Sequence, residues 1–199
     1  MSKLIYIKGN VFESVNSVSN MVATLFLETY QNNHGADEII TLDLNLTEHA
    51  NVFMNKNNFS TYFKDVNSQK WIDMLKEASK VVIALPMINF GPSATIKNFI
   101  DSICVPNETF TYKNSPDGQA IGMLGHLKVM IIATQGAPKT WYTWANHLSW
   151  LEGSWKFLGV KEVESIFITG TKVPPLNQLS PEKVLKTFEK EIVSKAKEF

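Results

Sequence analysis

The stretch from Val81 to Phe90 constrains the fold of this chain more than any other. Its first half, Val81-Val82-Ile83-Ala84-Leu85, is a run of β-branched and apolar residues typical of a strand buried on both faces. The run ends at Pro86, which lacks the N–H needed to continue a central ladder. A loop containing Gly91 and Pro92 follows, and Ser93 is suited to cap the helix behind it. Strand, sharp loop and helix is the arrangement in which open α/β sheets bind ligands, at the carboxyl ends of the strands.

Apolar runs and helical periodicity alternate along the rest of the chain. Further strands are predicted at 4–7, 38–44, 129–133 and 163–169. Helical spacing predicts helices over 18–30, from 68, over 96–103, over 141–157 and from 181, where Ser180-Pro181-Glu182 forms the cap. Strands alternating with helices through right-handed crossovers predict one α/β domain over 1–199, a three-layer sandwich whose five-stranded parallel sheet has the order 2-1-3-4-5.

Two segments do not fit this alternation. Residues 45–67 are rich in asparagine and aromatic residues without a sustained period, so we expect a surface excursion with a short helix, serving as a lid or a dimer contact. Within 104–128, Thr109-Phe110-Thr111-Tyr112 alternates like a strand and Ser115-Pro116-Asp117-Gly118 has turn chemistry. We expect an irregular or hairpin insertion there.

The predicted strand order brings three loops to the same edge of the sheet: Gly9–Ser19, Pro86–Gly91 and Thr134–Pro138. The first has polar residues at the start of a helix, where free N–H groups favour an anion: Ser14, Asn16, Ser17 and Ser19. It is neither a Walker loop nor a Gly-x-Gly-x-x-Gly loop. A phosphomonoester site is the specific interpretation, and an ordinary helix cap is the alternative.

The composition excludes several classes of function. The formal net charge is zero, so no long-range field attracts nucleic acid or an anionic membrane. Every basic residue is a lysine, which leaves phosphate binding to backbone N–H groups, hydroxyls or lysine. Cys104 is the only cysteine and is expected in the core, and the four histidines fall in no metal-ligand pattern. With no targeting signal and no apolar run near the roughly 20 residues of a membrane span, we expect a cytoplasmic protein.

Aromatic residues are concentrated near the predicted helix over 141–157. They are more numerous than one helix face of a monomer can bury, which favours a helix shared between the core and a partner subunit over a one-sided core. The residues are Trp141, Tyr142, Trp144, Trp150, Trp155 and Phe157.

Four segments together resemble the FMN-dependent NADH azoreductases, also called NADH:quinone oxidoreductases. Pro86-Met87-Ile88-Asn89-Phe90, followed by Ile96-Lys97-Asn98-Phe99-Ile100-Asp101, is similar to that family's Pro-Met-Tyr-Asn-Phe loop and its next helix. Ser17-Val18-Ser19-Asn20, Thr109-Phe110-Thr111-Tyr112 and Thr134-Gln135-Gly136 are similar to three further segments of the family. The similarity extends over nearly the whole chain, with two departures: Gly9-Asn10 replaces serines, and Ile88 replaces an aromatic residue.

The resemblance implies a flavodoxin-like homodimer with FMN as cofactor and NADH as electron donor. It implies that Ser17, Val18 and Ser19 surround the FMN phosphate, with Asn10 able to donate through its amide. It places Pro86, Met87, Ile88, Asn89 and Phe90 along the isoalloxazine, and Thr134, Gln135 and Gly136 at the pyrimidine edge. Active sites at the dimer interface would have Tyr112 at the substrate mouth.

The activity implied is ping-pong reduction of quinones and azo compounds by NADH through the flavin, which needs no catalytic acid or base from the protein. One alternative is a hydrolase of the acyl carrier protein phosphodiesterase type, for which the chain offers neither a metal cluster nor a nucleophile motif. The other is a non-enzymatic FMN electron carrier, a class that is usually acidic, whereas this chain is neutral.

Overall fold

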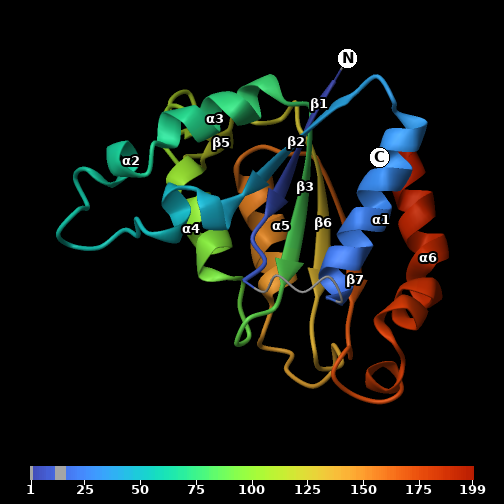
Figure 1. Cartoon of the computed structure of the whole chain (residues 1–199). Coiled ribbons are helices and arrows are strands. Elements are labelled where there is room, and N and C mark those ends of the chain that lie inside the picture. The colour runs from blue at the N-terminus through green and yellow to red at the C-terminus, as the bar shows by residue number, and fades with distance from the viewer. Residues whose placement is uncertain (1, 12–16) are drawn as a thin grey trace.

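A five-stranded parallel sheet forms the centre of the molecule (Figure 1). The computed structural model describes residues 2–11 and 17–199. The strands are β1 (Lys3–Lys8), β2 (Glu38–Asp43), β3 (Lys80–Pro86), β6 (Lys128–Thr134) and β7 (Glu162–Ile168), in the order β2-β1-β3-β6-β7. Counted among the strands of this sheet alone, the order is 2-1-3-4-5, so the predicted fold class and strand order are confirmed.

Helices cover both faces of the sheet and complete the three layers (Figure 1). One face packs against α1 (Val18–Asn33) and α6 (Pro181–Glu198). The other packs against α3 (Ser68–Glu77), α4 (Ala94–Ile103) and α5 (His147–Phe157). Successive strand residues point to opposite faces of the sheet. Leu4 therefore packs on the face covered by α1 and α6, and Ile5 packs on the face covered by α3, α4 and α5. This explains why the strands read as uninterrupted apolar runs.

Side-chain caps fix where α4 and α6 begin. Ser93 precedes α4 and accepts a hydrogen bond from the N–H of Ile96 at 3.4 Å. Ser180 precedes α6 and accepts from the N–H of Lys183, with Pro181 as the first helical residue. Both predicted caps are confirmed, and α1 and α3 also begin at the predicted residues, Val18 and Ser68.

The excursion over 45–67 holds only short helical turns: η1 (Leu44–Leu46), η2 (Glu48–Ala50) and α2 (Tyr62–Asp65). It is anchored by His49, which is fully buried and hydrogen-bonds the hydroxyls of Thr47 and Ser102, both at 2.9 Å. Its ring packs between those of Trp71 and Phe99. Burial lowers the pKa of His49 to about 4, because a charged imidazolium would be desolvated there.

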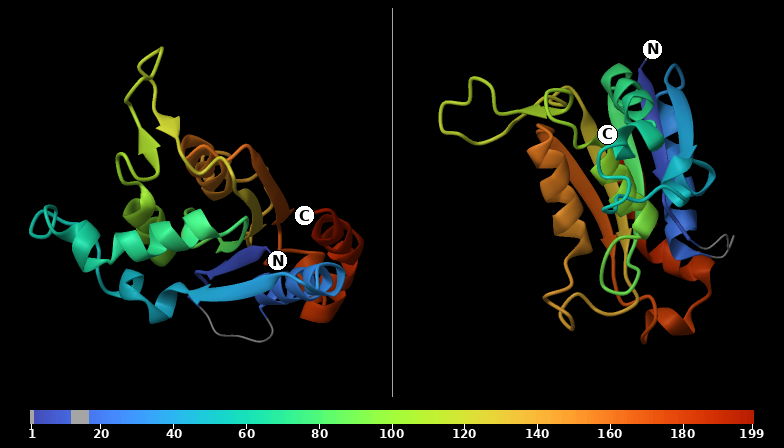
Figure 2. Two further views of the ribbon diagram at one scale, coloured as in Figure 1. Left: turned by 90° about the horizontal axis from the view of Figure 1, so that it is seen from above. Right: turned by 90° about the vertical axis from the view of Figure 1, so that its left-hand side faces the viewer.

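The insertion between α4 and β6 is an antiparallel hairpin of β4 (Phe110–Thr111) and β5 (Ile121–Gly122). It projects from the body of the molecule (Figure 2). Its base packs on the end of α5, where Gly122 approaches Gly159 so closely that an added Cβ would lie 2.1 Å from the Gly159 nitrogen. A final short turn, η3 (Leu176–Gln178), precedes α6.

The prediction of a helix over 141–157 is wrong for its first part, because α5 begins only at His147. Residues 138–146 form turns instead, closed by hydrogen bonds from the Trp141 N–H to the Pro138 oxygen and from the Ala145 N–H to the Tyr142 oxygen. This stretch contains threonines and aromatic residues, whose χ1 freedom is restricted in a helix. Its aromatic rings pack against the loop after β3, and that tertiary contact overrides the helical spacing.

Within the residues that the structure describes, no helix has the length and apolar character required to cross a membrane.

Candidate active site

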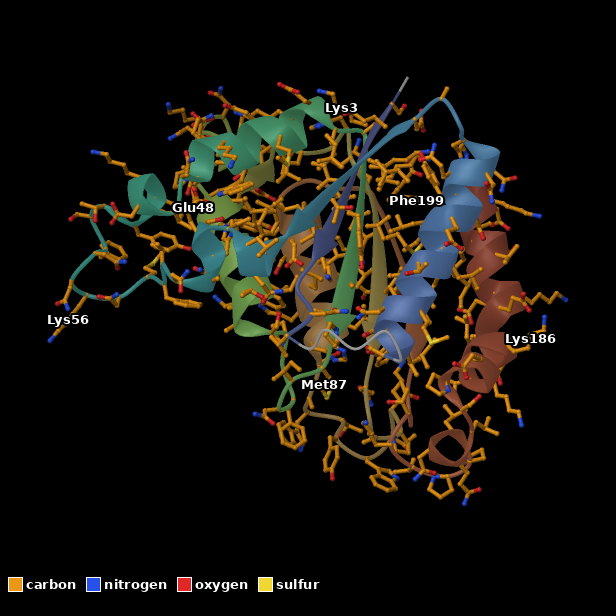
Figure 3. All side chains as sticks on the ribbon, viewed as in Figure 1. Lys3, Glu48, Lys56, Met87, Lys186 and Phe199 are labelled. Atoms are coloured by element: carbon orange, nitrogen blue, oxygen red, sulfur yellow. The ribbon has the colours of Figure 1, made fainter. Side chains whose placement is uncertain are left out.

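The carboxyl ends of β1, β3 and β6 meet at one edge of the sheet, as predicted. Figure 3 shows Met87, which follows β3, at this edge, and Lys3, which begins β1, near the opposite edge. The Met87 N–H donates to the Thr134 oxygen at 2.8 Å, so the loop after β3 is tied directly to the loop after β6. The edge carries the polar and glycine residues that the buried strands lack.

Ser93 ties the loop after β1 to the start of α4. Its buried hydroxyl donates to the Gly9 oxygen at 2.8 Å, besides capping α4. Gly9 itself lies against Ile96: an added Cβ would be 2.3 Å from Ile96 Cγ1 and 3.3 Å from the Ser93 hydroxyl. The glycine is therefore required by close packing between β1 and α4, which explains Gly9, though not Asn10, in the first of the two departures from the family.

The phosphate-type site was predicted at the N-terminus of α1, where the structure describes Ser17, Val18 and Ser19. Ser17 is the N-cap residue, yet its side chain makes no capping hydrogen bond, and its hydroxyl lies 2.9 Å from that of Ser19. Val18 begins the helix and packs on the core beneath it. Of the other predicted residues in this loop, Ser14 and Asn16 lie outside the described part of the chain. Serine hydroxyls beside the positive end of a helix dipole suit an oxyanion.

Asn10 lies beneath this helix terminus and is buried, with 4% of its surface exposed. Its amide nitrogen lies 3.5 Å from the Ser19 hydroxyl and also donates to the Asn20 side chain. Its backbone oxygen accepts from the Asn45 side-chain amide at 2.9 Å, which fixes the loop against η1, the turn that follows β2. Among the residues that the structure describes, the buried side-chain oxygen of Asn10 has no hydrogen-bond partner. A buried acceptor of this kind is satisfied when a donor group binds beside it.

The loop after β3 forms a tight two-residue turn. Ile88 and Gly91 exchange backbone hydrogen bonds at 2.8 and 3.1 Å, and the two residues between them, Asn89 and Phe90, have φ values of 46° and 73°. Positive φ at both central positions is the pattern of type I′ turns, which asparagine tolerates and phenylalanine does not favour. The turn holds Asn89 and Phe90 at the surface while Pro86, Met87 and Ile88 stay half-buried.

The loop after β6 is held by the segment that follows β7. The Gln135 N–H donates to the Ile168 oxygen at 2.9 Å, and the Lys172 N–H donates to the Gly136 oxygen at 2.9 Å. Thr134 and Gln135 are buried, and the Gln135 side-chain amide donates to the Ala137 oxygen at 2.9 Å. This loop therefore has a fixed backbone whose groups can face a ligand.

Sequence reasoning missed the contribution of residues 139–147. Tyr142 and Trp144 pack on Phe90, with ring centroids 5.1 and 4.8 Å away. Tyr142 also lines a cavity of about 230 Å³, together with Gln135, Lys139, Thr143, Ala145, Asn146, His147, Ser149 and Phe167. His147 is buried there, and its Nε2 has no hydrogen-bond partner among the described residues. Burial lowers the pKa of His147 to about 4, so its ring is neutral at physiological pH. The threonine and tryptophan content of 139–146 was the signal that this stretch is not helical.

The structure does not bring Tyr112 to this edge within one chain. Tyr112 follows β4 in the projecting hairpin, with 61% of its surface exposed, and its ring contacts Phe110. The hairpin base packs at Leu158 and Gly159, just before the start of β7, and so near the amino ends of the strands (Figure 2). Every other predicted site residue that the structure describes lies at the carboxyl edge.

Cys104 is half-buried and packs on the core, as predicted, and burial raises the pKa of its thiol to about 11. A thiol with so high a pKa is a poor nucleophile at neutral pH. Among the described residues, no group of three or more His, Cys, Asp or Glu side chains could hold a metal ion.

The sheet order and the loops at its carboxyl edge define a protein of the flavodoxin-like class. Comparison with known families agrees, because a family described as having a flavodoxin-like fold matches residues 2–192. An azoreductase from Bacillus anthracis str. Sterne superposes with a TM-score of 0.82 at 21% identity, over 100% of both chains.

Sequence relatives identify the family more narrowly. The chain is 48% identical over 199 residues, 100% of each chain, to the FMN-dependent NADH:quinone oxidoreductase of Mycoplasmopsis synoviae (strain 53). It is also similar to an FMN-dependent NADH-azoreductase from Bacillus anthracis str. Ames Ancestor, solved in complex with FMN, with 25% identity, a TM-score of 0.80 and 98% of each chain covered. The chain belongs to the family of FMN-dependent NADH:quinone oxidoreductases.

Proposed function

We propose that this protein is an FMN-dependent oxidoreductase that uses NADH to reduce quinones and azo compounds. The observation that carries the proposal is the convergence of three loops at one sheet edge, joined by the Ser93–Gly9 and Met87–Thr134 hydrogen bonds. Its relatives in the family are named for this cofactor and this electron donor.

The residues at the start of α1 fit the phosphate and side chain of FMN. The hydroxyls of Ser17 and Ser19 and the positive end of the helix dipole would hold the phosphate. The side-chain oxygen of Asn10, which has no partner in the described part of the chain, can accept a hydrogen bond from a ribityl hydroxyl but not from a phosphate dianion. This donor set does not require arginine, which the chain lacks.

The two other loops would hold the flavin ring. Met87, Ile88, Asn89 and Phe90 offer apolar contact together with the side-chain amide of Asn89, which can both donate and accept. Thr134, Gln135 and Gly136 form a strand end that is fixed by hydrogen bonds and would lie against the polar pyrimidine edge. The hydrogen bonds between these loops preorganise the site, so little ordering accompanies binding.

When bound, FMN supplies the redox chemistry, taking a hydride from NADH and passing two electrons to the acceptor. When the acceptor is a quinone, NADH and one proton from solvent reduce it to the quinol, and NADH becomes NAD⁺. The protein binds and orients donor and acceptor in turn at the same place, which gives ping-pong kinetics. No side chain need act as nucleophile or metal ligand.

We further propose that the active unit is a homodimer in the cytoplasm, where NADH is available. The exposed apolar side chains of the hairpin and the adjoining end of α5 support a subunit contact: Tyr112, Ile121, Met123 and Phe157. Since the hairpin lies away from the site of its own chain, Tyr112 would reach a substrate mouth only in the partner. Sedimentation analysis should give a dimer, and a monomer at micromolar concentration would contradict this contact.

Steady-state kinetics of the FMN-loaded protein test the activity. With NADH varied at several fixed concentrations of a small quinone, the double-reciprocal plots should be parallel and turnover sustained. Intersecting lines would exclude the ping-pong sequence. Absence of NADH-dependent quinone reduction by FMN-loaded protein would exclude the activity itself.

A further inference from the structure

Three aromatic side chains from two loops form a cluster at the carboxyl edge, which we call the aromatic platform: Phe90, Tyr142 and Trp144. Phe90 belongs to the turn after β3, and the other two belong to the loop after β6. The Phe90 ring lies edge-on to Tyr142, with centroids 5.1 Å apart and planes at 73°, and tilted at 47° to Trp144, with centroids 4.8 Å apart. Such inclined pairs do not cover both faces of each ring.

The chain keeps Phe90 in a costly conformation to build this cluster. A φ of 73° is natural for glycine or asparagine but unfavourable for phenylalanine. A glycine at this position would form the same turn without strain. Strain of this kind is concentrated at functional sites, which indicates that the ring itself is needed at this edge.

The outer member of the platform is largely open to solvent. Trp144 has 69% of its surface exposed, and Phe90 has 43% exposed. These rings lie together beside the loops proposed to hold the flavin, whereas scattered exposed aromatic residues would need no explanation. The open indole surface is therefore available to stack on a planar molecule that enters the site.

The chemistry of the platform favours an uncharged ring. Its three side chains carry no charge. A quinone or neutral azo compound needs only apolar and aromatic contact of this kind. We infer that the aromatic platform binds the ring of a planar, uncharged electron acceptor, with Trp144 as the stacking residue. This inference rests on the proposed function for the redox role of that ligand.

The experiment compares wild-type, Trp144→Ala and Trp144→Phe proteins loaded with FMN. Stacking of one aromatic ring corresponds to roughly 3- to 10-fold in affinity. We expect Trp144→Ala to raise the KM for 1,4-naphthoquinone and the dissociation constant of redox-inert 2-naphthol by about this factor. Trp144→Phe should restore most of the loss. At saturating NADH, the reduction of ferricyanide, which has no ring, should not change.

Phe59→Ala is the matched control, because Phe59 is an equally exposed aromatic residue in the excursion over 45–67. The inference is overturned if 2-naphthol binds wild-type and Trp144→Ala proteins equally. It is also overturned if Trp144→Ala dissociates the dimer and affects quinone and ferricyanide alike, since the platform would then be a subunit contact. The 2-naphthol titration requires no electron transfer. It therefore tests ligand binding by the aromatic platform even if the wild-type protein fails to oxidise NADH and the proposed function is wrong.

Discussion

Replacing Gly9 by alanine tests how closely β1 and α4 must approach to form the site. The added Cβ would lie 2.3 Å from Ile96 Cγ1 and 2.5 Å from its Cδ1, where carbon atoms normally stay about 3.5–4.0 Å apart. Ile96 is buried, with 1% of its surface exposed, so its side chain cannot move into solvent. The loop and the first turn of α4 must separate by roughly 1 Å, which typically costs about 1–3 kcal/mol of stability.

The same movement should loosen the cofactor site. The hydrogen bond from Ser93 to the Gly9 oxygen spans this contact, and Asn10 follows immediately. We expect Gly9→Ala to lower the free energy of unfolding in urea by about 1–3 kcal/mol and to weaken FMN binding. Gly136→Ala is the matched control, because its Cβ would meet the flexible Lys172 side chain, with Cγ at 2.8 Å. Its stability should change less.

A double-mutant cycle identifies the cause. Ile96→Ala alone leaves a cavity and should cost about 2–5 kcal/mol. In Gly9→Ala/Ile96→Ala the new methyl group occupies part of that cavity, so the double variant should be no less stable than Ile96→Ala. Additive losses, or a Gly9→Ala protein within about 0.5 kcal/mol of wild type, would refute the packing argument.

Two further outcomes follow from the buried histidines and from the α1 terminus. Burial holds the pKa values of His49 and His147 near 4, against about 6.5 in the unfolded chain, so the unfolded state binds more protons between these values. The free energy of unfolding should therefore fall as the pH drops from 7 to 5, by up to about 2 kcal/mol per histidine. The variant His49→Gln should flatten the pH dependence of the urea midpoint. An equally steep dependence in this variant would show that His49 is not the cause. In fluorescence titrations, Ser19→Ala should weaken FMN binding about 10-fold. Binding of riboflavin, which lacks the phosphate, should be nearly unaffected. Equal losses of affinity for both ligands would place the phosphate elsewhere.

The fold could be predicted because each layer is encoded by local patterns that agree with one another. The run from Val81 to Leu85 is apolar at every position, as a strand covered on both faces requires, and the structure buries all five residues. Ser93 and Ser180 mark helix starts through a capping interaction that depends on a few adjacent residues. Such signals do not depend on distant parts of the chain.

The start of α5 could not be predicted because a tertiary contact decides it. The spacing of Trp141, Trp144 and Leu148 suits a helix, but the first two rings lie on the surface with Tyr142, which packs on Phe90 in a separate loop. Only the folded structure brings the turn that contains Phe90 next to these residues. The reason for Gly9 was equally hidden, since it depends on Ile96, which is distant in sequence and adjacent in space.

The site itself was predicted in part. Strand order alone placed the loops after β1, β3 and β6 at one edge, and the hydrogen bonds between them agree. The serine-rich start of α1 followed from the chemistry of helix termini. The second role of Ser93, as a bridge to Gly9, and the cavity beside His147 depend on side-chain positions that periodicity does not specify.

Anaerobic titration of the FMN-loaded protein with NADH tests the central claim most directly. The account predicts that the visible flavin absorbance is lost on adding one equivalent of NADH and returns on adding one equivalent of a quinone, with the quinol as product. Flavin absorbance that persists in excess NADH, although FMN remains bound to the protein, would contradict the proposed function.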